Sequence, residues 1–223
     1  MLALGVLVSG EGTTLEALAE QAAGGHVPAR IAIVLSDRPS APALEKARRR
    51  GLATAIVPMR GTTPDAWAVR ATQLLTNAGV ELVLLAGFLS ILPPAFVHTW
   101  RGRAINVHPS LLPRHGGKGF YGDRVHAAVL AAGDTESGAS VHLVTDAVDG
   151  GPVLAQQRVP VEPGDTTERL RLRVRDAERV AHRRMLAKYV PVIVNLHAGR
   201  GTARVWTCDF TAEYVRINAS YRT

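Results

Sequence analysis

Short apolar runs alternate with segments of helical periodicity through the first 86 residues of the chain. The apolar runs cover residues 2–9, 31–35, 54–57 and 81–86, and the helical segments cover residues 15–22, 41–50 and 64–77. Apolar runs of this length, separated by helices, are typical of parallel strands that are buried on both faces. The sequence therefore predicts an α/β fold, with a mostly parallel central sheet and helices on both of its faces. Ligands of such sheets bind beyond the carboxyl ends of the strands, so functional residues are expected directly after the apolar runs.

A further apolar run ends on two polar side chains, Asn106 and His108. Residues i and i+2 of a strand point to the same face, so both side chains are predicted to project together beyond the strand end. Pro109 and Pro113 then prevent the backbone from continuing as regular structure. Residues 106–113, called the shelf below, therefore form a rigid support for an amide and an imidazole.

The first apolar run leads into a glycine turn, Ser9-Gly10-Glu11-Gly12-Thr13-Thr14. Small residues let backbone N–H groups approach a phosphate, and the N-terminus of the following helix adds unpaired donors and partial positive charge. The third glycine of a dinucleotide-binding turn and the lysine of a P-loop are both missing. The turn therefore predicts binding of a single phosphate and argues against a dinucleotide or a nucleoside triphosphate.

The pattern changes in the second half of the chain. Residues 139–144 and 153–161 alternate between apolar and polar side chains on either side of a turn at residues 146–151. This alternation is typical of a half-exposed antiparallel pair. Before it, residues 114–123, called the glycine loop below, contain four glycines. They are predicted to form a mobile loop beside the shelf that could close over a substrate.

The end of the chain carries less information. A long helix is predicted over about residues 166–189, followed by one strand-like stretch at residues 202–207. We see no repeat and no second domain. We therefore expect a single domain over residues 1–196, whose sheet has an antiparallel C-terminal extension, and a tail over residues 197–223 to which no role is assigned.

The net charge of +7 comes mostly from arginine, which gathers on predicted helices without interleaved aromatic side chains. Binding of single-stranded nucleic acid would use aromatic stacking platforms, so solvated helix faces are favoured over a nucleic-acid partner. A basic field would still attract an anionic small substrate.

Export, membrane and metal signals are lacking in the sequence. No apolar run reaches membrane-spanning length without a charge, glycine or proline, and the first residues lack a basic leader and a cleavage site. Cys208 is the single cysteine, which excludes an intramolecular disulfide and gives no hint of zinc. We expect a cytoplasmic protein without a membrane partner or a metal, and leave open whether it is a monomer or a homodimer.

Three polar residues have the chemistry of acyl transfer. The Asn106 amide can donate to an oxyanion, the His108 imidazole can donate a proton, and the Asp149 carboxylate can orient the imidazole and organise water. No serine or cysteine elbow stands nearby, so direct attack by a substrate amine through a tetrahedral intermediate is favoured over a covalent acyl-enzyme. Taken singly, each residue has a commoner structural interpretation: His108 as a buried core histidine, Asp149 as a turn former and Asn106 as a strand-end cap.

Three separated motifs in the same order resemble the phosphoribosylglycinamide formyltransferase family. They are the segments 86–92 (AGFLSIL), 106–113 (NVHPSLLP) and 140–153 (SVHLVTDAVDGGPV). The resemblance extends from the glycine turn to about Glu178. It implies a Rossmann-like formyltransferase fold and an enzyme that uses 10-formyltetrahydrofolate as cosubstrate to formylate the amine of glycinamide ribonucleotide, the third step of purine biosynthesis.

The resemblance also implies roles for individual residues. It places the catalytic groups on Asn106, His108 and Asp149. It places the substrate phosphate and ribose contacts on Gly12, Thr13, Thr14 and Glu178. It places the folate contacts on Leu89, Ser90, Ile91, Leu92, Val144 and Thr145.

The chain departs from the family pattern at two positions that bear on substrate affinity. Glu11 stands where the family turn usually has asparagine, and Ser90 replaces a frequent arginine. The glycine loop is also longer than in many members, and its Lys118 could reach an anionic substrate. Two alternatives therefore stay open: another folate-dependent formyltransferase or deformylase, and a catalytically weakened module that only binds folate or phosphate.

Overall fold

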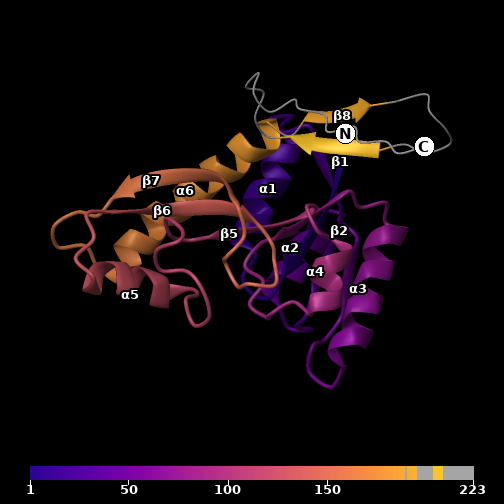
Figure 1. Ribbon diagram of the computed structural model, residues 1–223, viewed down its shortest axis with the longest axis horizontal. Helices are drawn as coiled ribbons and strands as arrows, with labels where there is room; N and C mark the ends of the chain where they lie inside the picture. The colour runs from indigo at the N-terminus through magenta and orange to yellow at the C-terminus, as the bar shows by residue number, and fades with distance from the viewer. Residues whose placement is uncertain (189, 195–202, 208–223) are drawn as a thin grey trace, which may run out of the picture.

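The computed structural model describes residues 1–188, 190–194 and 203–207 (Figure 1). The strands are β1 (Leu2–Val8), β2 (Ala29–Ser36), β3 (Thr54–Ile56), β4 (Leu82–Leu85), β5 (Ala104–His108), β6 (Glu136–Leu143), β7 (Val153–Pro160), β8 (Val190–Val194) and β9 (Ala203–Thr207). The helices are α1 (Thr13–Ala23), α2 (Pro42–Arg49), α3 (Pro64–Asn77), α4 (Pro94–Thr99), α5 (Asp123–Ala131) and α6 (Thr167–Lys188).

The main sheet has seven strands in the order β3-β2-β1-β4-β5-β6-β7. Neighbouring strands from β3 to β5 run parallel, whereas β6 is antiparallel to β5 and β7 is antiparallel to β6. The mostly parallel sheet with an antiparallel extension, predicted from the apolar runs, is confirmed. The strands β8 and β9 pair with each other in a separate sheet.

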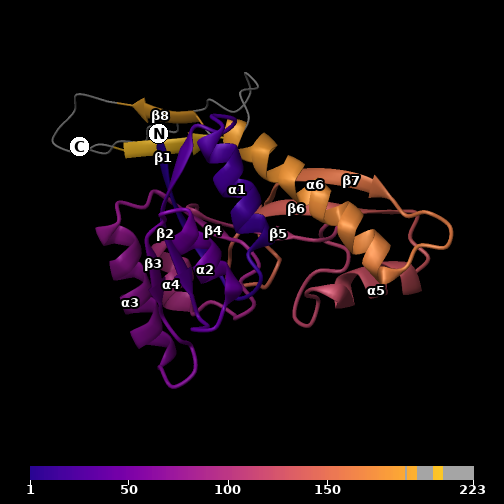
Figure 2. The same cartoon turned by 180° about the vertical axis from the view of Figure 1, so that it is seen from behind.

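Side chains of β1 alternate between two cores, as the twofold periodicity of a strand requires. Val6 and Val8 pack in a core with α1, α2 and α6, whereas Leu7 packs on the opposite face in a core with α3 and α4. Figure 2 shows α6 crossing in front of β6 and β7, and Figure 1 shows the same helix behind them. Both faces of the parallel part of the sheet are therefore covered, whereas β6 and β7 have α6 on one face. This covering leaves the strand ends for ligands.

Capping side chains mark the starts of two helices. Thr63 Oγ1 accepts a hydrogen bond from the Ala66 backbone N–H at 3.3 Å, and Pro64 occupies the first turn of α3. Thr166 Oγ1 likewise accepts from the Arg169 N–H at 3.3 Å before α6. These hydrogen bonds satisfy donors that have no partner inside a helix.

Some elements were not predicted. Helix α4 is only six residues long, too short to show helical periodicity. It begins at a proline, a residue that the first turn of a helix tolerates. Strand β8 was also missed, and β6 begins at Glu136, earlier than predicted, because Gly138 weakens the strand pattern there. Strand β9 agrees with the strand-like stretch near residues 202–207. Most of the predicted tail, with Cys208, lies outside the described residues.

Candidate functional site

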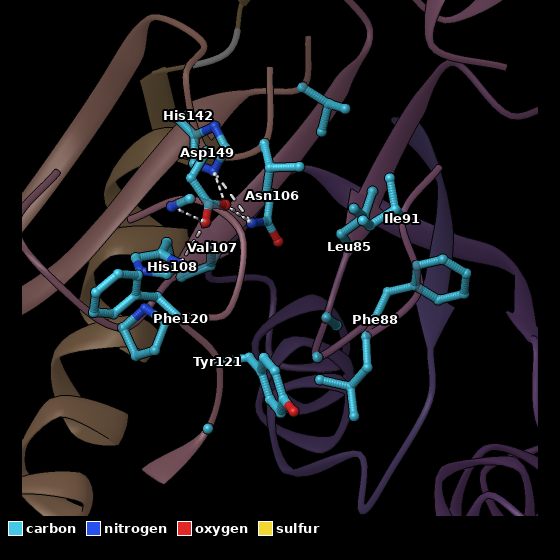
Figure 3. A pocket seen from close by; sticks show the side chains of 18 of the residues that line it. Leu85, Phe88, Ile91, Asn106, Val107, His108, Phe120, Tyr121, His142 and Asp149 are labelled. Atoms are coloured by element: carbon cyan, nitrogen blue, oxygen red, sulfur yellow. Dashed lines mark hydrogen bonds and ion pairs between the residues drawn. The ribbon is translucent and has the colours of Figure 1, made fainter. Parts of the chain in front are cut away.

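A cavity of about 610 Å³ opens at the carboxyl ends of β1, β4 and β5 (Figure 3). Its walls come from the glycine turn, the shelf, the loop after β4, the loop after β6, the glycine loop and one face of α6. The volume lies within the range of small-molecule sites. Segments far apart in the sequence thus meet where the parallel topology predicts a ligand.

The predicted trio Asn106, His108 and Asp149 lies together in this cavity. Asn106 Nδ2 donates to Asp149 Oδ1 at 3.3 Å, and His108 Nδ1 lies 3.3 Å from Asp149 Oδ2. The Gly117 backbone N–H also donates to Oδ2 at 3.0 Å. The carboxylate therefore connects both shelf side chains to the glycine loop (Figure 3).

His142 is a fourth polar group that the sequence did not single out. Its Nε2 lies 3.1 Å from Asn106 Nδ2 and 3.5 Å from Asp149 Oδ1. Strand β6 pairs with β5 so that His142 stands directly opposite Asn106. The alternation of β6 hinted at a strand, but the antiparallel register that brings the two side chains together cannot be read from the sequence.

The orientation of the Asn106 amide bears on the oxyanion-donor role predicted for it. Its Nδ2 points to Asp149 and His142, so its carbonyl oxygen faces the cavity (Figure 3). An amide that donates to a substrate oxyanion would have to rotate about its last side-chain bond, which is a soft torsion. In this orientation Asn106 organises the carboxylate, and the predicted role as an oxyanion donor would require such a rotation.

The environment of His108 determines which of its nitrogens can exchange a proton. The side chain is buried, and Nε2 lies 2.8 Å from the His115 carbonyl oxygen, so Nε2 carries a hydrogen. The nitrogen that titrates is Nδ1, which faces Asp149. Burial lowers the pKa of His108 below its ordinary value, although the Asp149 charge and the His115 carbonyl act in the opposite direction. At neutral pH the imidazole is then mostly neutral and able to accept a proton.

Asp149 is the ionised partner of this pair. Burial acts to raise its pKa, but hydrogen bonding with His142, the charge of His108 and the Gly117 N–H together lower the pKa below its ordinary value. Asp149 also has a positive φ of 53°, an uncommon conformation for a residue with a side chain. The turn therefore holds a charged carboxylate in a fixed place at the bottom of the cavity.

The glycine turn brings the start of α1 into close contact with α2. Gly12, at the N-cap of α1, has φ +75°, and a Cβ there would lie 2.6 Å from Ala43 Cβ. Thr13 and Thr14 follow it and line the cavity. Neither Glu11, which is exposed, nor Gly12, which is buried, lines the cavity.

Helix α6 contributes charged side chains that the sequence analysis assigned to solvated faces. Arg171, Arg175 and the predicted ribose contact Glu178 line the cavity and share one helical face, with spacings of four and seven residues from Arg171. That spacing is the signal that could have found them. Arg175 Nε and Nδ1 of the cavity residue His126 are buried without a hydrogen-bond partner in the described part of the chain. Polar substrate groups can therefore bind at this end.

The opposite end of the cavity is apolar. The predicted folate contacts Leu89, Ser90, Ile91, Leu92, Val144 and Thr145 all line it. Leu89 is 48% exposed and Ile91 is 62% exposed, which is unusual for large apolar side chains and suits an apolar ring. Ser90 Oγ donates to Asp37 Oδ2 at 2.6 Å. Phe120 and Tyr121 of the glycine loop, which the sequence analysis did not single out, also line the cavity: Phe120 lies beside His108, and Tyr121 lies between Phe120 and Phe88 (Figure 3). Lys118 of the same loop lines the cavity as well.

Known proteins share this arrangement of fold and motifs. A profile of the family described as formyl transferase matches residues 3–186. The phosphoribosylglycinamide formyltransferase of Escherichia coli (strain K12) is 34% identical over 193 residues, which cover 86% of this chain and 89% of the relative. The chain belongs to the phosphoribosylglycinamide formyltransferase family.

Solved structures of the phosphoribosylglycinamide formyltransferase family share the fold. Glycinamide ribonucleotide transformylase 1 from Symbiobacterium toebii superposes with a TM-score of 0.78 at 35% identity, covering 85% of this chain and 90% of that chain. The trifunctional purine biosynthetic protein adenosine-3 of Drosophila pseudoobscura pseudoobscura is 40% identical over 185 residues. That match covers 82% of this chain but only 13% of the relative, so it concerns one segment of a much longer protein.

The family and fold predicted from the three motifs are thus confirmed. Within the described residues, no group of three or more histidine, cysteine, aspartate or glutamate side chains could hold a metal ion. No helix in that same part of the chain is both long and apolar enough to cross a membrane.

Glu178 should make stability depend on pH in a direction opposite to that of most carboxylates. Burial raises its pKa from 4.5 to about 7. A carboxyl with a raised folded-state pKa favours the folded state at low pH, and this advantage is lost as pH rises from about 4.5 through about 7. Because glutamine cannot ionise, Glu178→Gln is expected to gain melting temperature relative to the unmodified protein between pH 5 and pH 8, as measured by thermal unfolding at both pH values.

Glu168→Gln is the matched control, because a hydrogen bond from Arg171 lowers the pKa of Glu168. It should show no such relative gain at pH 8. Equal melting-temperature differences at the two pH values for Glu178→Gln would contradict the prediction.

Proposed function

We propose that this chain transfers the formyl group of 10-formyltetrahydrofolate to the primary amine of glycinamide ribonucleotide, the third step of purine biosynthesis. The observation that carries the proposal is the meeting, in one cavity, of the Asn106, His108 and Asp149 trio with a phosphate-type turn at one end and an apolar wall at the other. These three features suit a reaction between a phosphorylated amine and a formyl donor with a flat heterocyclic ring.

The ends of the cavity suit the two substrates. The phosphate would bind the backbone N–H groups at Gly12, Thr13 and Thr14, where the helix N-terminus favours an anion. Arg175 would add positive charge, and Glu178 would accept hydrogen bonds from ribose hydroxyls. The pterin would lie between the loop after β4 and the loop after β6, which both line the cavity.

The proposed chemistry begins with attack of the amine nitrogen on the formyl carbon. A new C–N bond forms, and negative charge develops on the formyl oxygen. His108 Nδ1 accepts the proton that the attacking nitrogen loses, directly or through a water held by Asp149, and the resulting imidazolium stabilises the oxyanion. The Asn106 amide, once rotated, adds a second donor. The proton then passes to N10 of the folate as the old C–N bond breaks, which restores neutral His108.

Residues 1–196 are proposed to form one domain, and residues 197–223 a tail without an assigned role. We also propose a cytoplasmic location, with small-molecule substrates and no nucleic-acid or membrane partner. Monomer and homodimer are equally compatible with this function.

The test is an absorbance assay that mixes purified protein with 10-formyltetrahydrofolate and glycinamide ribonucleotide. Formation of tetrahydrofolate and formylated product that depends on both substrates is the expected result. A deformylase would release formate without the amine, and a binding module would show folate binding in calorimetry without any product. Either outcome, obtained with folded protein, would contradict the proposal.

A further inference from the structure

His115 contacts His108 through its backbone carbonyl and Asp134 through its imidazole. Its backbone carbonyl oxygen lies 2.8 Å from His108 Nε2, inside the proposed active site. Its imidazole Nε2 lies 2.6 Å from Asp134 Oδ2, at the junction between α5 and β6. The residue therefore connects the proposed catalytic imidazole to a carboxylate that does not line the active-site cavity.

The backbone of His115 needs such a contact. Its φ is +54°, in the left-handed region that is disfavoured for residues with a Cβ. This conformation directs the carbonyl to His108 while the side chain points to Asp134. Without the attachment of the imidazole, the backbone is free to relax toward an ordinary conformation, and the carbonyl would turn away from His108.

Asp134 is itself firmly held. Arg114 donates to its two carboxylate oxygens, from Nε at 2.8 Å and from an Nη at 2.5 Å. Hydrogen bonds from Arg114 and then from His115 lower the pKa of Asp134 to about 2, so the carboxylate stays ionised over the working pH range. Ser110 Oγ donates to the Arg114 carbonyl at 2.7 Å, which ties the same segment to the shelf.

We propose that Asp134 and the imidazole of His115 are positioning residues for His108. They hold the His115 carbonyl against His108 Nε2, which keeps the hydrogen on Nε2 and leaves Nδ1 as the nitrogen that exchanges a proton opposite Asp149. This inference rests on the formyl-transfer role proposed above, and it deepens that role by explaining how the reactive tautomer is selected. It differs from a direct catalytic role, because neither side chain touches the reacting atoms.

The expected electrostatic effect has a definite sign. Asp149 and the His115 carbonyl raise the pKa of His108, whereas burial and the imidazoles of His142 and His115 lower it. The imidazole of His126 is also close enough to interact with His108. Loss of the carbonyl contact therefore lowers the pKa of His108 and makes it a weaker base. The acid limb of the pH profile of kcat/KM should move to lower pH, and its plateau should fall by about tenfold to a hundredfold, as for a misplaced catalytic group.

Two variants separate the side-chain contact from the backbone conformation. Asp134→Asn removes the charge that attracts the His115 imidazole. His115→Gly keeps the left-handed backbone accessible but removes the imidazole. The matched control is Glu136→Gln, which breaks the exposed ion pair between Glu136 and Arg158 at 2.6 Å on the neighbouring strands and leaves His115 untouched.

The decisive measurement is nitrogen-15 NMR of labelled histidine, which reports the tautomer and the titration of His108 without requiring turnover. We expect the unmodified protein and Glu136→Gln to show the Nε2–H form, and both test variants to show a lower His108 pKa and a mixture of tautomers at unchanged far-UV circular dichroism. The kcat values of the two test variants should fall while KM changes little.

An unchanged His108 tautomer and pKa in both folded test variants would overturn the positioning role. Behaviour of His115→Gly like that of the unmodified protein would also overturn it, because the backbone conformation would then suffice without the imidazole. Absence of formyl transfer in the unmodified protein would overturn the proposed function, whereas the NMR result would still decide whether Asp134 positions His108.

Discussion

Asp149→Asn is expected to lower kcat/KM for formyl transfer by about 10²- to 10⁴-fold, the range that a positioned proton-transfer group contributes. The substitution keeps the shape of the side chain but removes the charge opposite His108 Nδ1. That charge is the largest of the influences that raise the pKa of His108, so its loss lowers the pKa further. The imidazole becomes a weaker base, and the remaining activity should have its acid limb at lower pH. Steady-state kinetics between pH 5 and pH 9 would measure both effects.

The control for this prediction is Asp176→Asn, which makes the same chemical change on α6, where the Asp176 side chain is 70% exposed. It should retain the kinetics of the unmodified protein. Thermal unfolding of both variants would show that Asp149→Asn remains folded. If the folded variant kept kcat/KM within a few-fold of the unmodified protein, Asp149 would have no part in proton transfer.

Gly12→Ala is expected to raise KM for the phosphorylated substrate by tenfold or more, and to reduce the free energy of unfolding by about 1–3 kcal/mol, a typical cost of overpacking. A Cβ at this position would lie 2.6 Å from Ala43 Cβ and 2.8 Å from Ala43 Cα, so the turn or α2 must move. Because the backbone N–H groups after Gly12 are the proposed phosphate donors, that movement weakens phosphate binding. Because the His108 site lies at a different strand end, kcat should change less than KM.

Gly25→Ala separates steric overlap from backbone strain. Gly25 also has a positive φ, +69°, but a Cβ there meets nothing within 4 Å. It should lose some stability and keep the substrate KM. Kinetics with varied glycinamide ribonucleotide, together with denaturant unfolding, would compare the two variants. An unchanged KM in Gly12→Ala would remove the glycine turn from the phosphate site.

Most of the fold could be predicted because it depends on short-range patterns. Apolar runs between helices indicate parallel strands, and the observed sheet order places their carboxyl ends along one edge. Asn106 and His108 could be paired because residues two apart in a strand share a face. Asp149 could be added through the turn and motif around it. The short helix α4 was not predicted because fewer than two turns carry too little periodicity.

Contacts across the fold could not be predicted in the same way. His142 joins the trio only because β6 pairs with β5 in one register, and a shift by one residue would turn the side chain to the other face. The sequence analysis assigned Arg175 to a solvated basic helix face, whereas in the structure α6 packs beside the cavity and Arg175 lines it. The orientation of the Asn106 amide depends on Asp149 and His142, which come from other segments.

The sequence by itself therefore determined the order of most strands and helices, the shelf with its two polar side chains, and the glycine turn, because each depends on residues that are neighbours along the chain. Only the tertiary structure decided which nitrogen of His108 can exchange a proton. That choice depends on the His115 carbonyl on one side and Asp149 on the other. In our proposal it also depends on the contact of the His115 imidazole with Asp134. Burial and hydrogen bonding between distant segments set protonation, and no local pattern in a sequence encodes them.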